Sequence, residues 1–349
     1  MIPHEKTAAV ARGLRETFGV TEFEDIQMLS GGPRSDLIFR IAVKGSHYLL
    51  RIIRRVSDPA CHIISMKSAA ESGLAPHVRF TSIEDGIYIT DFVKAVPFPQ
   101  GEALVRMPNA LRALHALPPF PGRANHLNTS CTFLLNKGPA LDEFIRSFQV
   151  ADLLPQNEKE ELFARYAEVA AAYPHVGSDM VSSHNDLVRP GNILFDGNRP
   201  WLVDWEAAFL NDRYADLAVV ANFVATTDAE EKQYLHAYFG HSPDEYQLAR
   251  FFLMQQVAHI FYAMAYLLLG SSGKPIDWTE DVPDFGDFHK GMWTGEIKVA
   301  DSRTKIAYSR VHWNRLLRNM RQARFGEAVR IVSAQHRPHF TLATAGRGH

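Results

Sequence analysis

Residues 182–208 read SSHNDLVRPGNILFDGNRPWLVDWEAA and place several metal or proton acceptors in one short span. Two apolar runs, ILF and WLV, flank a DGN turn signal at 196–198, which predicts a β-hairpin. A hairpin brings its outer ends together, so Asn192 at the start of the first strand and Asp204 at the end of the second should converge. Their amide and carboxylate oxygens are the hard ligands that Mg²⁺ prefers.

Asp186 lies in the loop before this hairpin. It is near the predicted metal ligands without being an evident ligand itself, which leaves it able to orient a hydroxyl and accept its proton. A metal that bridges phosphates and a carboxylate that aligns a nucleophile are the parts that phosphoryl transfer needs. The stretch therefore predicts that reaction class.

Composition sets the outer limits. The chain has 349 residues, 46% of them hydrophobic and 22% charged, which is enough for two lobes or one large domain. A formal net charge of −2 gives no basic field for nucleic acid. Cys61 and Cys131 form no CxxC or Cys/His metal spacing, which favours a reducing, cytoplasmic setting.

The chain carries no evident secretory or membrane segment. The N-terminal residues lack the uninterrupted apolar core of a signal peptide. The most apolar stretch, 251–270, is interrupted by Gln255, Gln256 and His259. We therefore expect a buried core helix there, and no membrane partner.

Periodicity predicts an α+β fold of two lobes. A helix is expected over 4–18, strands over 37–43 and 48–53, a helix over roughly 59–72, and two strands around the EDG turn at 84–86. Beyond the Pro-rich KAVPFPQG the chain reads as mostly helical, including 140–148, and strand-like residues return only in the hairpin. The predicted boundaries are 1–93 for the N-terminal nucleotide-binding lobe, 94–101 for the connector, 102–336 for the C-terminal catalytic lobe and 337–349 for a mobile tail.

Several motifs in a fixed order extend this interpretation. The segments GGPRSDLIFRI, YLLRI, ESGLAPHV, ITDFV, ALRALH, HNDLVRPGNILF, LVDWEAA and DRYADLA resemble the aminoglycoside phosphotransferase and choline kinase superfamily, over about residues 27–220. That family has a protein-kinase-like fold, with a small antiparallel-sheet lobe and a larger helical lobe. The resemblance implies ATP and Mg²⁺ as cofactors and a small-molecule hydroxyl as acceptor.

The resemblance also implies roles for individual residues. Asp186 would be the catalytic aspartate, with Asn192 and Asp204 as Mg²⁺ ligands. Arg51 would hold the α and β phosphates, a task that suits its planar fork of donors. The phosphate loop would contain Gly31, Gly32 and Ser35, and the adenine-binding hinge would contain Asp91, Phe92 and Val93.

Four further residues near the predicted site are assigned from the residue pattern together with the family resemblance. His184 and Asp216 are expected to brace the catalytic loop without taking part in chemistry. Glu206 is either a further metal ligand or a surface carboxylate. Arg189 is either solvated, which we favour, or near the γ-phosphate.

The acceptor is the least determined part. DWEAA resembles the DWEYA form of choline and ethanolamine kinase-like members, which favours an amino alcohol. An ammonium group binds carboxylates or aromatic faces, and the candidate substrate contacts are Asp186, Arg189, Trp205, Glu206, Tyr262 and Trp278. Core packing is the alternative role for the aromatic residues of 251–266.

Two departures from the family pattern affect the predicted site. The family places Asn five residues after the catalytic Asp, whereas Asn192 is six residues after Asp186; a bulge at Pro190–Gly191 could absorb the extra residue. The Glu that usually pairs with the basic strand residue is replaced by His62. Asp58 and Glu71 are poorly spaced to substitute for it.

These features favour a small-molecule kinase acting on an amino alcohol. An aminoglycoside or other small-molecule phosphotransferase, or a nucleotide-binding protein with an inactive kinase site, are the alternatives. A protein kinase is disfavoured because WEAAFLND is too short for an activation segment. The sequence leaves the oligomeric state and the choice between ATP and GTP open.

Overall fold

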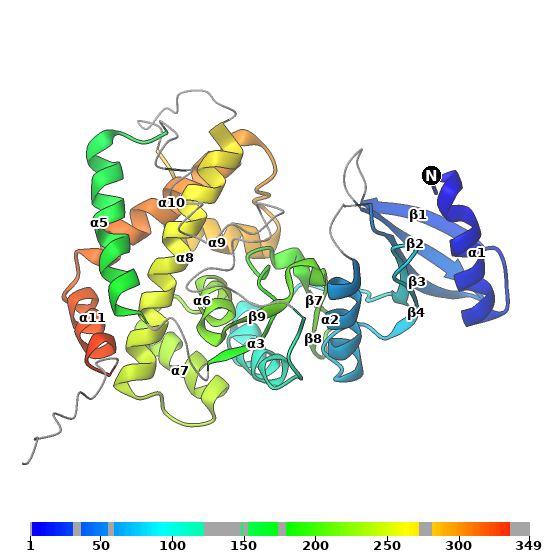
Figure 1. Cartoon of the computed structure of the whole chain (residues 1–349), viewed down its shortest axis with the longest axis horizontal. Coiled ribbons are helices and arrows are strands. Elements are labelled where there is room, and N and C mark those ends of the chain that lie inside the picture. Colours follow the sequence, from blue (N-terminus) through cyan, green and yellow to red (C-terminus); the bar gives the residue numbers. More distant parts are fainter. Residues whose placement is uncertain are drawn as a thin grey trace, which may run out of the picture.

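The computed structural model describes residues 2–30, 36–54, 59–121, 148, 153–173, 179–271 and 281–335. It has two lobes: strands and two helices form the N-terminal lobe at one end, and helices fill the rest (Figure 1). The predicted α+β, protein-kinase-like architecture is confirmed.

The N-terminal lobe is a five-stranded antiparallel sheet in the order β1-β2-β3-β5-β4. Its elements are α1 (His4–Phe18), β1 (Asp25–Ser30), β2 (Leu37–Val43), β3 (Ser46–Ile52), α2 (Pro59–Glu71), β4 (Val78–Ser82) and β5 (Ile87–Asp91). Phe39 and Ile41 of β2 are fully buried, as the alternating apolar pattern predicted, and they share a core with Leu14 of α1.

Strand β1 was not predicted from the sequence. It is an edge strand that pairs only with β2, and five of its six residues are exposed. An exposed edge strand has no buried face, so it shows no apolar alternation for sequence analysis to detect.

The C-terminal lobe begins after an extended segment, 92–99. Its helices are α3 (Gln100–His115), α5 (Gln156–Ala172), α6 (Arg213–Val224), α7 (Asp228–Phe239), α8 (Glu245–Ser271), α9 (Phe285–Thr294), α10 (Ser302–Met320) and α11 (Ala323–Gln335). The structure describes only residue 148 of the helix predicted over 140–148, and the predicted tail lies outside the described residues.

Helix α8 runs through the middle of this lobe (Figure 1). It is long and apolar enough to cross a membrane, but 89% of its apolar 18-residue stretch is buried inside the molecule. Gln256 and His259, which interrupt the apolar run, are almost fully buried as well. The prediction of a core helix is confirmed.

Two short sheets position the candidate site. Strands β7 (Ile193–Phe195) and β8 (Pro200–Leu202) form the predicted hairpin. A second pair, β6 (Met180–Ser183) with β9 (Phe209–Asp212), contradicts the expectation that strands return only in the hairpin. These strands have four residues each and pair across an intervening hairpin, so local sequence gives little sign of them.

Candidate active site

The loop after β6 is held in place by one buried carboxylate. Asp216, in the first turn of α6, accepts hydrogen bonds from the backbone N–H groups of His184 (2.8 Å) and Asn185 (2.9 Å). Burial alone would raise the pKa of Asp216, but hydrogen bonding and charge from His115 and the nearby His184 lower it. Asp216 is therefore an ionised brace for this loop.

Asn185 is a second brace that sequence reasoning missed. Its backbone is left-handed, with φ of 65°, a conformation that Asn tolerates better than most residues. Its side-chain Nδ2 donates to the Ala207 carbonyl at 2.9 Å, and its Oδ1 accepts from Asn211 Nδ2 at 2.7 Å. These bonds tie the loop to η2 (Trp205–Ala207) and to β9.

Asp186 and Asn192 face each other despite the six-residue spacing. Asn192 Nδ2 donates to the Asp186 backbone oxygen at 2.9 Å and to Asp186 Oδ2 at 3.0 Å. A 3-10 turn, η1 (Pro190–Asn192), takes up the chain between them. The extra residue is therefore accommodated at Pro190–Gly191 without separating the two side chains.

The environment of Asp186 favours a proton acceptor that works near neutral pH. Burial, followed by the negative charges of Asp204 and Glu206, raises the pKa of Asp186 to about 7, against the opposing influence of Arg189 and Asn192. A general base is most effective when its pKa lies near the working pH.

The hairpin places Asp204 beside Asn192. The Val203 N–H donates to the Asn192 backbone oxygen at 3.0 Å, and His184 Nε2 contacts the Val203 carbonyl at 2.9 Å. Asp204 has a left-handed backbone, with φ of 67°, which is uncommon for a residue other than glycine. The ends of the hairpin therefore converge as the turn signal predicted.

Arg51 of β3 reaches across the cleft between the lobes. Its Nη1 donates to Asp204 Oδ1 at 2.7 Å and to the Tyr88 hydroxyl at 3.4 Å, and its Nη2 lies 3.6 Å from Glu206 Oε2. Burial would raise the pKa of Asp204, but the charge and hydrogen bond of Arg51 lower it. Glu206 thus lies against the guanidinium rather than on an open surface.

The main partner of Arg51 is Asp36, which sequence reasoning missed. Asp36 Oδ2 accepts from Arg51 Nε at 2.8 Å and from Nη2 at 2.7 Å. Of the substitutes considered from sequence, Glu71 is exposed at the end of α2 and Asp58 lies outside the described residues. The signal that could have found Asp36 was its position directly before β2, antiparallel to the strand that carries Arg51.

A cavity of about 190 Å³ lies between the sheet and the hairpin. Its walls are mostly apolar, and Arg51, Asn192 and Asp204 are among its few polar lining residues, which suits a ring system bearing an anionic tail. Its lining residues are Ile38, Leu49, Arg51, Met66, Pro76, Tyr88, Thr90, Asp91, Phe92, Val93, Gly191, Asn192, Leu194, Leu202, Val203, Asp204 and Trp205.

The predicted hinge residues line this cavity, but they are not equivalent. The Asp91 carboxylate pairs with Arg79 at 2.7 and 3.1 Å, and the Asp91 N–H donates to the His77 carbonyl at 2.9 Å. Adenine pairing would therefore depend on the backbone of Phe92 and Val93. Gly31, Gly32 and Ser35 lie outside the described residues.

Two of the aromatic residues proposed for the acceptor site are buried. Trp205 and Tyr262 are each 1% exposed: Trp205 packs against His184 and Phe120, and Tyr262 packs against Tyr266 and Tyr308. Tyr262 therefore lies in the core, whereas Trp205 packs in the core and also lines the cavity. Trp278 lies outside the described residues.

Arg189 lies beside Asp186. Its side chain is 42% exposed, and its Nε lies 3.7 Å from Asp186 Oδ2. Burial raises the pKa of the Tyr266 hydroxyl to about 12, while the charge of Arg189 and a hydrogen bond to Arg189 act in the opposite direction. Arg189 is thus partly solvated but directed into the site.

The donor set fits Mg²⁺ only with help from a phosphate. Asn192 uses its Nδ2 on Asp186, so its Oδ1 remains an acceptor, and Asp204 supplies a carboxylate. In the described part of the chain no group of three or more His, Cys, Asp or Glu side chains is placed to hold a metal. Two protein oxygens completed by phosphate and water is a normal arrangement for Mg²⁺.

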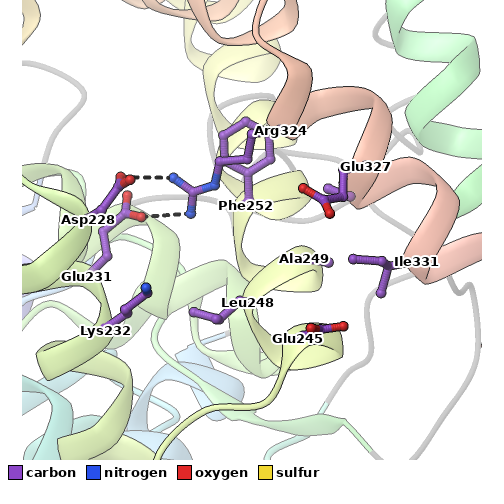
Figure 2. A pocket seen from close by; sticks show the side chains of 11 residues that line it. Asp228, Glu231, Lys232, Glu245, Leu248, Ala249, Phe252, Arg324, Glu327 and Ile331 are labelled. Carbon is purple, nitrogen blue, oxygen red and sulfur yellow. Dashed lines mark hydrogen bonds and ion pairs between the residues drawn. The ribbon is translucent and has the colours of Figure 1, made fainter.

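A second pocket, of about 290 Å³, lies between α7, α8 and α11 (Figure 2). Arg324 pairs there with Asp228 at 3.2 Å and with Glu231 at 2.9 Å, and it lies over the Phe252 ring at 4.4 Å. These charges pair with each other, and the pocket holds none of the predicted site residues.

A model of the phosphotransferase enzyme family matches residues 30–252, and the chain belongs to that family. No curated protein sequence matches the chain.

Solved structures share the fold at low identity. A choline/ethanolamine kinase family protein from Mesorhizobium loti has a TM-score of 0.66 at 19% identity, covering 94% of this chain and 99% of the other. Choline kinase from Cryptosporidium parvum has a TM-score of 0.62 at 11% identity, with the same coverage. A spectinomycin phosphotransferase in complex with ADP and its antibiotic has a TM-score of 0.50 at 13% identity, covering 94% and 97%.

Proposed function

We propose that the chain is an ATP- and Mg²⁺-dependent kinase that transfers the γ-phosphate to a hydroxyl of a small molecule. The observation that carries the proposal is that Arg51, Asn192 and Asp204 line one apolar cavity between the two lobes, with Asp186 hydrogen-bonded to Asn192 beside it. A base, two oxygen ligands and a phosphate-binding guanidinium are the groups that such a transfer needs.

The roles follow from the geometry. Asp186 orients the acceptor hydroxyl and takes its proton as the oxygen attacks the γ-phosphorus, while the bond to the β–γ bridging oxygen breaks and ADP leaves. Asn192 and Asp204 would hold Mg²⁺, which when bound offsets the charge of the phosphate oxygens. Arg51 holds the non-transferred phosphates through its planar fork of N–H donors.

We propose an amino alcohol as the acceptor. The structures with the two higher TM-scores above are described as choline or choline/ethanolamine kinases. In this chain Asp186, Asp204 and Glu206 gather negative charge where an ammonium-bearing alcohol would approach. The cytoplasm, where ATP is available, is the proposed location.

One observation favours a second acceptor class. Arg189, directed at Asp186, brings a positive charge to the mouth of the site. A bulky polyhydroxyl acceptor such as an aminoglycoside could place hydroxyls against the guanidinium and its ammonium groups against the carboxylates. This second candidate keeps the same phosphoryl transfer and changes only the acceptor.

The test is a panel of amino alcohols, aminoglycosides, sugars and nucleosides, read as ADP release with ATP and Mg²⁺. Turnover of choline or ethanolamine supports the leading acceptor. Turnover of aminoglycosides alone moves the chain to the second acceptor class. If none of the acceptors on the panel is turned over, the amino-alcohol assignment is contradicted.

Two substitutions separate chemistry from binding. Asp186→Ala is expected to abolish turnover while ATP binding persists, because the base does not hold the nucleotide. Asp204→Ala is expected to weaken binding of Mg²⁺ with ATP. Full turnover by Asp186→Ala would remove Asp186 from the mechanism.

A further inference from the structure

The position that usually supplies a carboxylate to the phosphate-binding residue is occupied here by a neutral histidine. His62 of α2 lies against Tyr88, with ring centroids 5.5 Å apart, and its Nε2 has no hydrogen-bond partner among the described residues. Burial and the positive charge of Arg51 lower the pKa of His62 to about 3. Histidine carries no negative charge in either protonation state, so His62 cannot form an ion pair with Arg51.

Asp36 supplies the Arg51 guanidinium with the carboxylate that His62 lacks. Its side chain is 4% exposed, and one of its oxygens accepts from both Nε (2.8 Å) and Nη2 (2.7 Å) of Arg51. This side-on contact fixes the plane of the guanidinium as well as its position. Nη1 is then directed toward Asp204 on the far side of the cleft.

Asp36 is itself anchored to the sheet. Its second oxygen accepts from the Arg54 backbone N–H at 2.9 Å. Leu37, the next residue, pairs with Ile52, so Asp36 and Arg54 lie at the same end of adjacent antiparallel strands. The carboxylate and the guanidinium thus sit on one rigid hairpin, and neither depends on the position of α2.

We propose that Asp36 is the positioning residue for Arg51, and that it replaces a helix-borne carboxylate with one fixed to the β2–β3 hairpin. This inference rests on the proposed function, since Arg51 acts on the nucleotide phosphates. Asp36 does not touch the substrate in this account. It acts through Arg51 by holding two of its N–H groups, which leaves Nη1 directed at Asp204 in the cavity lining.

The test is a double-mutant cycle on nucleotide affinity. The dissociation constant for ATP with Mg²⁺ is measured by calorimetry for the wild type, Asp36→Asn, Arg51→Met and the double variant. Asp36→Asn keeps the shape and removes the charge. If Asp36 acts through Arg51, it weakens binding about tenfold or more in the wild type and has little further effect in the Arg51→Met background.

A matched control guards against a general effect of lost carboxylates. Asp85→Asn removes another carboxylate of the N-terminal lobe, one that pairs with Arg12 near the surface, and is expected to leave ATP affinity unchanged. Thermal unfolding confirms that each variant is folded. In Asp36→Asn the KM for ATP should rise while the KM for the acceptor stays constant, a split that a merely structural role would not produce.

The outcomes are distinguishable. Unchanged ATP affinity in a folded Asp36→Asn variant, or equal losses in both backgrounds, overturns the inference and leaves the proposed function standing. A wild-type chain that binds no nucleotide overturns the proposed function and this inference with it.

Discussion

Asp186 combines a buried position with a charge that the proposed reaction needs. Its pKa is raised from an ordinary value of 3.8 to about 7, chiefly by burial. Between pH 3.8 and about pH 7, the folded state therefore keeps the Asp186 carboxyl protonated, whereas the unfolded chain has released that proton. Ionising Asp186 costs stability as pH rises from about 4 toward 7, with an upper limit of about 4 kcal/mol from the size of the shift.

Asp186→Asn removes this cost and should make the protein more stable while it abolishes turnover. The amide oxygen can still accept from Asn192 Nδ2, so the hydrogen bond survives. We expect the nucleotide-free variant to melt a few degrees above the wild type at pH 8, and above it by less than half of that margin at pH 5. Thermal unfolding at the two pH values checks this. Equal melting temperatures at pH 8 would contradict the proposed cost of ionising Asp186.

Asn185 supports Asp186 from the adjacent position. Asn185→Ala would lose the buried bonds to Ala207 and Asn211 and would place alanine at φ of 65°. We expect a loss of about 2–4 kcal/mol in the free energy of unfolding, together with a lower kcat.

Asn185→Gly is the matched comparison, because glycine accepts this backbone conformation without strain. It should lose the hydrogen bonds only and be the more stable of the two variants. Denaturant unfolding measures both, and an alanine variant as stable as the glycine variant would exclude a contribution from the backbone.

The β7–β8 hairpin shows how far sequence reasoning reaches at the level of secondary structure. Its turn signal and two apolar runs are local, so both strands were predicted and were found to pair. Strands β1, β6 and β9 were missed, because an exposed edge strand and two four-residue strands carry no periodicity of their own. Their pairing depends on tertiary structure that a local pattern does not contain.

The same distinction applies to the candidate site. Asp186, Asn192 and Asp204 belong to one stretch, and their proximity could be predicted from a turn and a hairpin. The Asp36–Arg51 pair joins two strands 15 residues apart, and the role of Asp36 became visible only from the register of that pairing. The buried positions of Trp205 and Tyr262 likewise follow from packing between distant helices and loops.

Helices α8, α9 and α10 meet at three buried histidines. His259 Nδ1 lies 3.0 Å from His312 Nδ1, and His289 Nδ1 contacts the Phe285 carbonyl at 2.8 Å. Burial lowers the pKa of all three, in the case of His289 to about 4. The folded protein holds these side chains neutral, whereas the unfolded chain protonates them near pH 6.5.

Each of these depressed pKa values contributes stability that is fully present above pH 6.5 and is lost as pH falls toward 4. For His289 alone the loss at pH 5 is about 2 kcal/mol. His289→Gln should lower the free energy of unfolding at pH 7.5 and make it less sensitive to pH between 7.5 and 5. Denaturant unfolding at both pH values checks this, and a variant with the wild-type pH dependence would show that His289 is not responsible.

The two lobes are joined at several points around the cleft. The Leu202 N–H donates to the Leu74 carbonyl at 2.8 Å, and Trp293 Nε1 donates to the Phe98 carbonyl in the connector at 2.7 Å. Arg51 adds a charged link from the sheet to Asp204. A ligand bound in the cavity would contact both lobes, so its binding should stabilise the whole molecule.

We therefore expect ATP with Mg²⁺ to raise the melting temperature cooperatively. At a nucleotide concentration 100 times the dissociation constant the gain is about 2.7 kcal/mol. Chelating the metal with EDTA should remove most of this gain, because Asn192 and Asp204 would then offer no bridge to the phosphates. A melting temperature that responds equally to ATP with and without the metal would contradict the assigned roles of these residues.

The most direct test of the central claim is transfer of radiolabelled γ-phosphate from ATP to an amino alcohol by the wild type and by Asp186→Asn, with ATP affinity measured on the same samples. The account predicts a labelled product from the wild type, none from the variant, and equal ATP affinity in both. Labelled product at the wild-type rate from Asp186→Asn would contradict it.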